Sequence, residues 1–151
     1  INNYEDFIEG VIYPDSVTDK SLTHYGPTSS QVNLKRFFED KDINTDFNKG
    51  YCIHLITDYL FYNKFLTIFS SNYIYNDYDI LNKELKRKFE VKIPQKVEDK
   101  VFYTEGETRI LNLKDTIKFI EETSSNNIND IKKAVFSGDK DWLEIRPLKR
   151  I

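Results

Sequence analysis

Apolar side chains recur every three to four residues along most of the chain, which is the spacing of one helix face. Residues 2–12 show it first, with Tyr4, Phe7 and Val11 on one side, and Pro14 ends that segment. The same spacing predicts helices over residues 33–40, 77–91, 112–122 and 129–136, with a last turn over 139–145. Residues 97–110 are expected to include a short extended piece.

The strongest helical pattern covers Thr45 to Ser70. Thr45 or Asp46 can cap its start, and aromatic and aliphatic residues then follow helical spacing as far as Phe69. The segment is apolar nearly all round, which is typical of a helix buried on every side. We therefore expect a central, buried helix over 45–70.

The fold class follows from these elements and from the length. The chain has 151 residues, the length of one ordinary domain, with only 5 Gly and 4 Pro. We predict an all-α fold, a single-domain multi-helix bundle over 1–151 around the helix 45–70. The chain opens on Ile1 and contains no Met, so its natural N-terminus is expected to be missing.

The charge and the hydropathy of the chain restrict which binding partners and which location can be expected. Twenty-two Lys and Arg against 25 Asp and Glu give a net charge of −3, so no nucleic-acid partner is expected. The basic run 83–88 is read as a solvated helix face. The chain contains no run of about 18 consecutive apolar residues, so no transmembrane segment is predicted. A cytoplasmic location is expected, with secretion left open by the missing start.

Histidine and cysteine counts limit the available chemistry. One Cys cannot form an internal disulfide or a Cys-rich zinc site, and only two His are present. His54 and Asp58 lie four residues apart on the central helix, so they share a face one turn apart. Gly50 precedes them by one turn and suits the close approach of another segment, for which the loop carrying Asp15 and His24 is the candidate.

Asp15 and His24 lie in the loop-like stretch 13–30. Together with His54 and Asp58 they offer two imidazoles and two carboxylates, a donor set suited to Zn²⁺, with Mn²⁺ or Fe²⁺ as alternatives. The same residues also suit a simpler arrangement of buried hydrogen bonds without a metal.

The order of motifs resembles the bacterial zinc-dependent phospholipase C family. The resemblance covers about the first 65 residues and rests on the following positions: Phe7, Gly10, Pro14-Asp15, Thr23-His24, Asn33-Leu34, Phe37, Phe47, Gly50-Tyr51, His54-Leu55 and Asp58. It implies an all-helical fold and a phosphoester or phospholipid substrate. It also implies that Asp15, His24, His54 and Asp58 hold one metal ion, with Asp15 as general base.

Departures from the family pattern restrict what the resemblance implies. The family binds three metal ions, and it has a further His where this chain has Lys64. No third His exists here for the family's later His–Glu pair, and the only Trp is Trp142 rather than one near the start. One metal site of the three is therefore expected.

Three hypotheses follow. In the first, the chain is a metal-dependent hydrolase of phosphoesters. In the second, it is a non-catalytic helical protein in which a single metal is structural and ties the loop to the central helix. In the third, no metal binds and the His–Asp pairs are structural hydrogen bonds.

Overall fold

A computed structural model describes residues 1–151, and the backbone divides into two compact units. The first comprises Ile1–Leu66 and Ser125–Pro147, and the second comprises Thr67–Ser124 and Leu148–Ile151. Seven α-helices together with five short 3₁₀ or π-helical turns carry most of the chain, and the sheet is one pair of two-residue strands, so the all-α class is confirmed. That the whole chain is a single domain stays a prediction. None of the helices is both long and apolar enough to cross a membrane.

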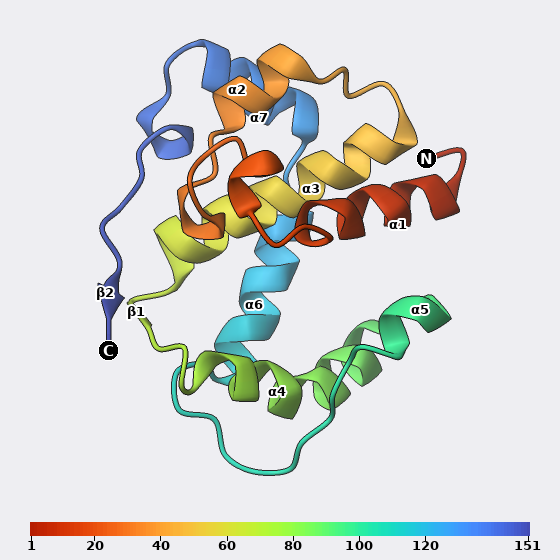
Figure 1. The fold of residues 1–151 in the computed structure, drawn as a ribbon, viewed down its shortest axis with the longest axis vertical. Helices are drawn as coiled ribbons and strands as arrows, with labels where there is room; N and C mark the ends of the chain where they lie inside the picture. The colour runs from red at the N-terminus through yellow and green to blue at the C-terminus, as the bar shows by residue number, and fades with distance from the viewer. The chain divides into compact units, whose positions relative to one another are not determined.

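The first unit is built from helices and short helical turns (Figure 1). Its elements are α1 (Tyr4–Ile12), η1 (Tyr13–Asp15), η2 (Lys20–Leu22), η3 (Ser29–Gln31), α2 (Leu34–Asp40), α3 (Asp46–Leu60), η4 (Phe61–Phe65), α7 (Ile128–Phe136) and η5 (Lys140–Trp142). Asparagine and threonine side chains begin three of the helices by accepting a backbone N–H, namely Asn3, Asn33 and Thr45. The helices predicted over 2–12, 33–40 and 129–136 are therefore present, with boundaries shifted by one or two residues.

α3 is the buried helix that the pattern predicts, because every residue from Asp46 to Leu60 is buried or half-buried. Its packing partners come from far along the chain. The core cluster joins α2, α3 and α7 through residues that include Phe37, Leu55, Ile56 and Val135. α3 therefore presents His54 and Asp58 from a rigid, well-packed element.

The predicted extent of this helix, 45–70, is wrong at its end. α3 stops at Leu60, continues as a π-helical turn, and reaches extended backbone at Leu66. The Asn63 side chain donates to the Tyr59 carbonyl, and the Arg146 guanidinium donates to the carbonyls of Tyr62 and Leu66. Arg146 lies some eighty residues away in sequence. The end of α3 could therefore not be predicted from the local pattern of apolar residues.

α1 lies along α3 (Figure 1). One glycine on each helix faces the backbone of the other helix. A Cβ on Gly10 would lie 1.9 Å from the Phe47 carbonyl oxygen, and a Cβ on Gly50 would lie 2.0 Å from that of Phe7. The close approach predicted at Gly50 is therefore present. The segment that makes it is α1, not the loop carrying Asp15 and His24, so that part of the prediction is wrong.

The second unit contains β1 (Ile68–Phe69), α4 (Ile74–Phe89), α5 (Gln95–Glu98), α6 (Leu113–Ser124) and β2 (Lys149–Arg150), with β1 and β2 parallel. α4 begins three residues before the predicted 77–91. No β-strand forms within 97–110, where a short extended piece is predicted, and this region begins with the end of α5. The fully buried Asp77 carboxylate accepts the backbone N–H groups of Arg109, Ile110 and Leu111, which fixes the approach to α6.

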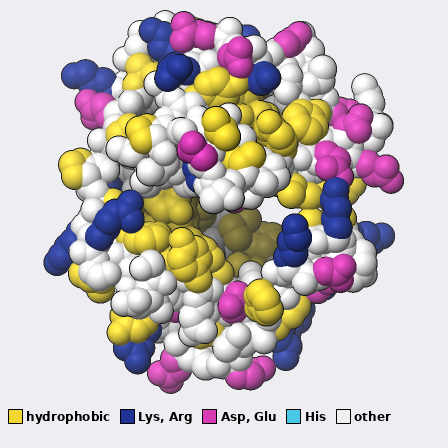
Figure 2. All heavy atoms as spheres, viewed as in Figure 1, with side chains coloured by type: hydrophobic (Ala, Val, Ile, Leu, Met, Phe, Trp, Pro, Cys, Tyr) yellow, Lys and Arg dark blue, Asp and Glu magenta, His cyan; other side chains and the backbone are white.

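Charged side chains of both signs are intermixed over the face that Figure 2 shows. In the basic run of α4, Lys86 lies 3.1 Å from Glu98 and Lys83 lies 4.0 Å from Glu105, while Arg87 pairs with Glu84. This run is therefore a helix face on which each of these cations has an acidic neighbour. Exposed pairs of this kind contribute little to stability.

Candidate metal centre

The first unit brings all four predicted site residues together. Asp15 ends the 3₁₀ turn that follows α1, and His24 lies two residues after η2. Pro14 lies in η1 and favours that turn, because its φ is already fixed near the helical value. The Asp19 carboxylate accepts the N–H of Ser21 and so begins η2. His54 and Asp58 project from α3, one turn apart.

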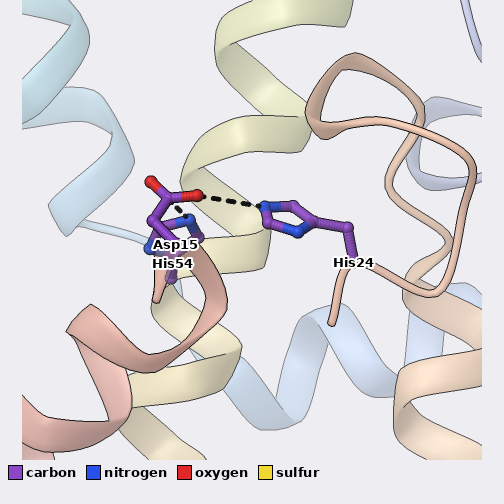
Figure 3. Close-up of side chains that lie close together, drawn as sticks. All are labelled: Asp15, His24 and His54. Atoms are coloured by element: carbon purple, nitrogen blue, oxygen red, sulfur yellow. Dashed lines mark ion pairs between the residues drawn. The ribbon is translucent and has the colours of Figure 1, made fainter. Parts of the chain in front are cut away.

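The side chains of His24 and His54 both point a ring nitrogen toward the Asp15 carboxylate (Figure 3). Asp58 Oδ2 lies 3.0 Å from His24 Nε2 and 3.2 Å from His54 Nε2. Each oxygen of the Asp15 carboxylate faces a different histidine. Oδ1 lies 3.7 Å from His24 Nε2, and Oδ2 lies 3.6 Å from His54 Nε2. Ligand atoms of Asp15, His24 and His54 all lie within 4.8 Å of one another.

These separations match the size of a metal coordination shell. Zinc binds imidazole nitrogen and carboxylate oxygen at about 2.0–2.1 Å, so neighbouring ligands of a tetrahedral ion lie about 3.3–3.4 Å apart. The four nitrogen–oxygen distances of the cluster run from 3.0 to 3.7 Å around that value. Asp15, His24 and His54 therefore fit one ion of zinc's size, and Asp58 Oδ2 lies beside both of the imidazole nitrogens that would bind it.

The other nitrogen of each imidazole is held by an oxygen. His54 Nδ1 lies 2.7 Å from the carbonyl oxygen of Val11 at the end of α1. His24 Nδ1 lies 2.9 Å from Thr23 Oγ1 and 3.2 Å from the carbonyl oxygen of Lys20. Carbonyl oxygens only accept, so both Nδ1 atoms carry the proton and donate it. In each neutral ring, the lone pair then belongs to Nε2.

The cluster consequently lacks a hydrogen-bond donor when both rings are neutral. Two Nε2 lone pairs face carboxylate oxygens at 3.0 and 3.2 Å, an arrangement that requires a cation or added protons. His54 Nε2 is moreover fully buried and has no hydrogen-bond partner in line with it. Two carboxylates against one divalent ion would leave the group neutral, whereas without a metal a proton on His54 partly balances the two negative charges.

Exposure differs sharply among the four side chains. The His24 side chain is completely buried, whereas the Asp15 side chain is 56% exposed. Lys20 Nζ approaches Asp15 Oδ1 to 3.5 Å and also donates to the Val17 carbonyl at 2.7 Å. The cluster therefore opens to solvent on the side of Asp15, where Lys20 adds a positive charge.

The charges of the cluster shift two of its pKa values. Contact with His54 is the main cause that lowers the pKa of Asp15, against the opposing effect of its partial burial. Burial by itself lowers the pKa of His54, but the Asp15 and Asp58 carboxylates outweigh it and raise that pKa to about 10. In the metal-free protein, a proton on His54 therefore takes the place that a metal ion would occupy.

This shift predicts how the stability of the metal-free protein depends on pH. A pKa raised from about 6.5 in the unfolded chain means that the stabilisation is complete below pH 6.5 and is lost as the pH rises toward 10. In chelator, we expect the free energy of unfolding, measured in urea, to fall from pH 7 to 10. The fall should be smaller in His54→Gln, and equal slopes in the two proteins would contradict the assignment.

A cavity of about 1070 Å³ in the same unit lies apart from these groups. Its walls include Tyr25, Lys35, Arg36 and Trp142, and none of the four site residues. The candidate metal ligands therefore lie outside this cavity.

Sequence reasoning identified the four convergent side chains and missed the groups that hold them. The Val11 carbonyl carries no sequence signal, because every residue has one. Lys20 is five residues from Asp15, and its approach depends on the turn at η2. Comparison with protein-family models, with curated proteins and with solved structures finds no match for this chain.

Proposed function

We propose that this chain binds one divalent metal ion through Asp15, His24, His54 and Asp58. The observation that carries the proposal is the convergence of two Nε2 lone pairs and two carboxylates at separations of 3.0–3.7 Å, with no hydrogen-bond donor among them when both rings are neutral. A mixed set of imidazole and carboxylate ligands favours Zn²⁺, with Mn²⁺ or Fe²⁺ as alternatives.

The function proposed for this centre is hydrolysis of phosphoesters, with phospholipids among the candidate substrates. A bound divalent ion supplies Lewis acidity toward a phosphoryl oxygen and toward water. Asp15 is the residue of the four that reaches solvent, and its lowered pKa keeps it a carboxylate at neutral pH. It is therefore placed to accept a proton from an attacking water as general base. The sequence resemblance to the zinc-dependent phospholipase C family supports the same role.

A specific observation favours a second function, in which the ion is purely structural. Two histidines and two aspartates complete a four-coordinate zinc shell, and structural sites are closed in this way. The ligands also come from separate segments, namely η1, the residues after η2, and α3. An ion among them would tie the 15–24 loop to the central helix.

The two functions separate in one set of measurements. Protein grown with added zinc and manganese is expected to contain about one equivalent of a divalent metal by elemental analysis. Under the hydrolase proposal it turns over a chromogenic phosphodiester or a phosphocholine ester. Asp15→Asn should then lose most of this activity, since efficient general bases contribute about 10²–10⁴-fold. Asp141→Asn, which changes an 82% exposed carboxylate, serves as the control.

Each outcome decides between the proposals. Less than a tenth of an equivalent of metal contradicts both metal functions and leaves the His–Asp contacts as hydrogen-bonded ion pairs. Full occupancy without turnover on a panel of phosphomonoesters and phosphodiesters contradicts the hydrolase and supports the structural ion.

A further inference from the structure

Thr23 is a buried polar residue between the two loop segments that carry Asp15 and His24. Its side chain is 1% exposed, and its hydroxyl makes two short contacts. Thr23 Oγ1 donates to the carbonyl oxygen of Pro14 at 2.7 Å and lies 2.9 Å from His24 Nδ1. A third, longer contact of 3.4 Å reaches the carbonyl of Lys20. One hydroxyl thus touches the residue before Asp15 and the ring of His24.

The directions of these hydrogen bonds follow from counting protons. A threonine hydroxyl has one proton, and a carbonyl oxygen cannot donate. The proton therefore goes to Pro14, and Thr23 Oγ1 must accept the Nδ1–H of His24. The carbonyl of Lys20, 3.2 Å from the same Nδ1, also requires a proton there. His24 is consequently held in the tautomer whose Nε2 lone pair faces Asp58 and Asp15.

The backbone of Thr23 connects this arrangement to the central helix. Its carbonyl oxygen accepts a hydrogen bond of 2.5 Å from the hydroxyl of Tyr51. Tyr51 lies on α3, three residues before His54, and is itself buried. Thr23 therefore has contacts with all three segments that supply the four converging side chains.

We propose that Thr23 is the positioning residue of the metal centre, and this rests on the metal binding proposed above. It fixes the tautomer and orientation of His24, and through Pro14 it sets the position of Asp15. Groups that hold the second nitrogen of a ligating histidine typically change metal affinity about 10–100-fold when removed. Thr23 would act in this way on one ligand directly and on a second through the backbone.

The test compares three variants of the full chain in a zinc titration against a competing chelator. Thr23→Val keeps the shape and removes the hydroxyl, and it is expected to weaken zinc binding about 10–100-fold. Thr23→Ser restores the hydroxyl and should bind within about threefold of wild type. Thr116→Val is the matched control, because Thr116 is also buried and donates to a backbone carbonyl, that of Asn112 at 2.7 Å. It should leave the affinity unchanged.

A second readout reports the hydrogen bond itself. In the zinc-loaded protein, the Nδ1–H proton of His24 should give a slowly exchanging NMR signal in wild type and Thr23→Ser, shifted or lost in Thr23→Val. Equal affinity and an unchanged signal in Thr23→Val would overturn the proposal while leaving metal binding intact. Absence of zinc binding in the wild type would instead overturn the proposed function, and this inference with it.

Discussion

His54→Ala is expected to remove the metal from the purified protein. His54 contributes one of only two nitrogen ligands, and its Nε2 lies 3.2 and 3.6 Å from the two carboxylates. Loss of a residue that binds the ion directly should cost more than the roughly 10–100-fold typical of residues that support a ligand. We therefore expect zinc affinity to fall more than a hundredfold, measured by chelator competition, and the isolated variant to contain less than a tenth of an equivalent.

Cys52 provides the matched control on the same helix. A thiolate is a strong zinc ligand, and Cys52 lies two residues from His54. The Cys52 side chain is completely buried, and burial raises the pKa of its thiol to about 12, which keeps it protonated at neutral pH. Cys52→Ala should therefore retain about one equivalent of metal. Metal loss in Cys52→Ala together with retention in His54→Ala would contradict the assigned ligands.

Gly50→Ala is expected to destabilise the first unit by about 3 kcal/mol, near the upper end of the range for overpacked positions. The added Cβ would lie 2.0 Å from the carbonyl oxygen of Phe7 and 2.9 Å from the amide nitrogen of Val11, both backbone atoms of α1. Backbone cannot rotate away as a flexible side chain can, so the two helices must separate. The better helix propensity of alanine offsets only about 1 kcal/mol of this cost.

Gly138→Ala separates the steric effect from a general effect of replacing glycine. Gly138 has a φ of +83° and open space around its Cβ position, so only backbone strain of about 1 kcal/mol is expected. The measurement is the urea midpoint and slope for both variants. If Gly50→Ala were no less stable than Gly138→Ala, the close crossing of α1 and α3 would be contradicted.

The two predictions are connected through Val11. Its amide nitrogen is one of the atoms that a Gly50 Cβ would strike, and its carbonyl oxygen holds His54 Nδ1 at 2.7 Å. The glycine contact thus brings the end of α1 close enough to α3 to orient a site residue. This explains physically why a glycine stands one turn before His54 on a helix whose other side chains are larger.

The sequence by itself determined the helical class, the buried central helix and the identity of the converging side chains. Periodicity marks a helix because side chains three and four residues apart share a face, and this also placed His54 beside Asp58. With only two histidines in the chain, His24 was the available second nitrogen ligand. These conclusions depend on the spacing of residues along the chain and on residue counts, and both can be read directly from the sequence.

Tertiary structure alone decided where α3 ends, which segment meets Gly50, and how the imidazoles are oriented. Arg146 donates hydrogen bonds to carbonyls at the end of the π-helical turn, and α1 packs against Gly50. The Val11 carbonyl and the Thr23 hydroxyl accept hydrogen bonds from Nδ1 of His54 and of His24. The carbonyls of Val11 and Tyr62 and the backbone of α1 come from segments that are separate from their partners in sequence, and the direction of the Thr23 hydrogen bond depends on the Pro14 carbonyl. Every residue carries such backbone groups, so their partners are defined only when the chain has folded.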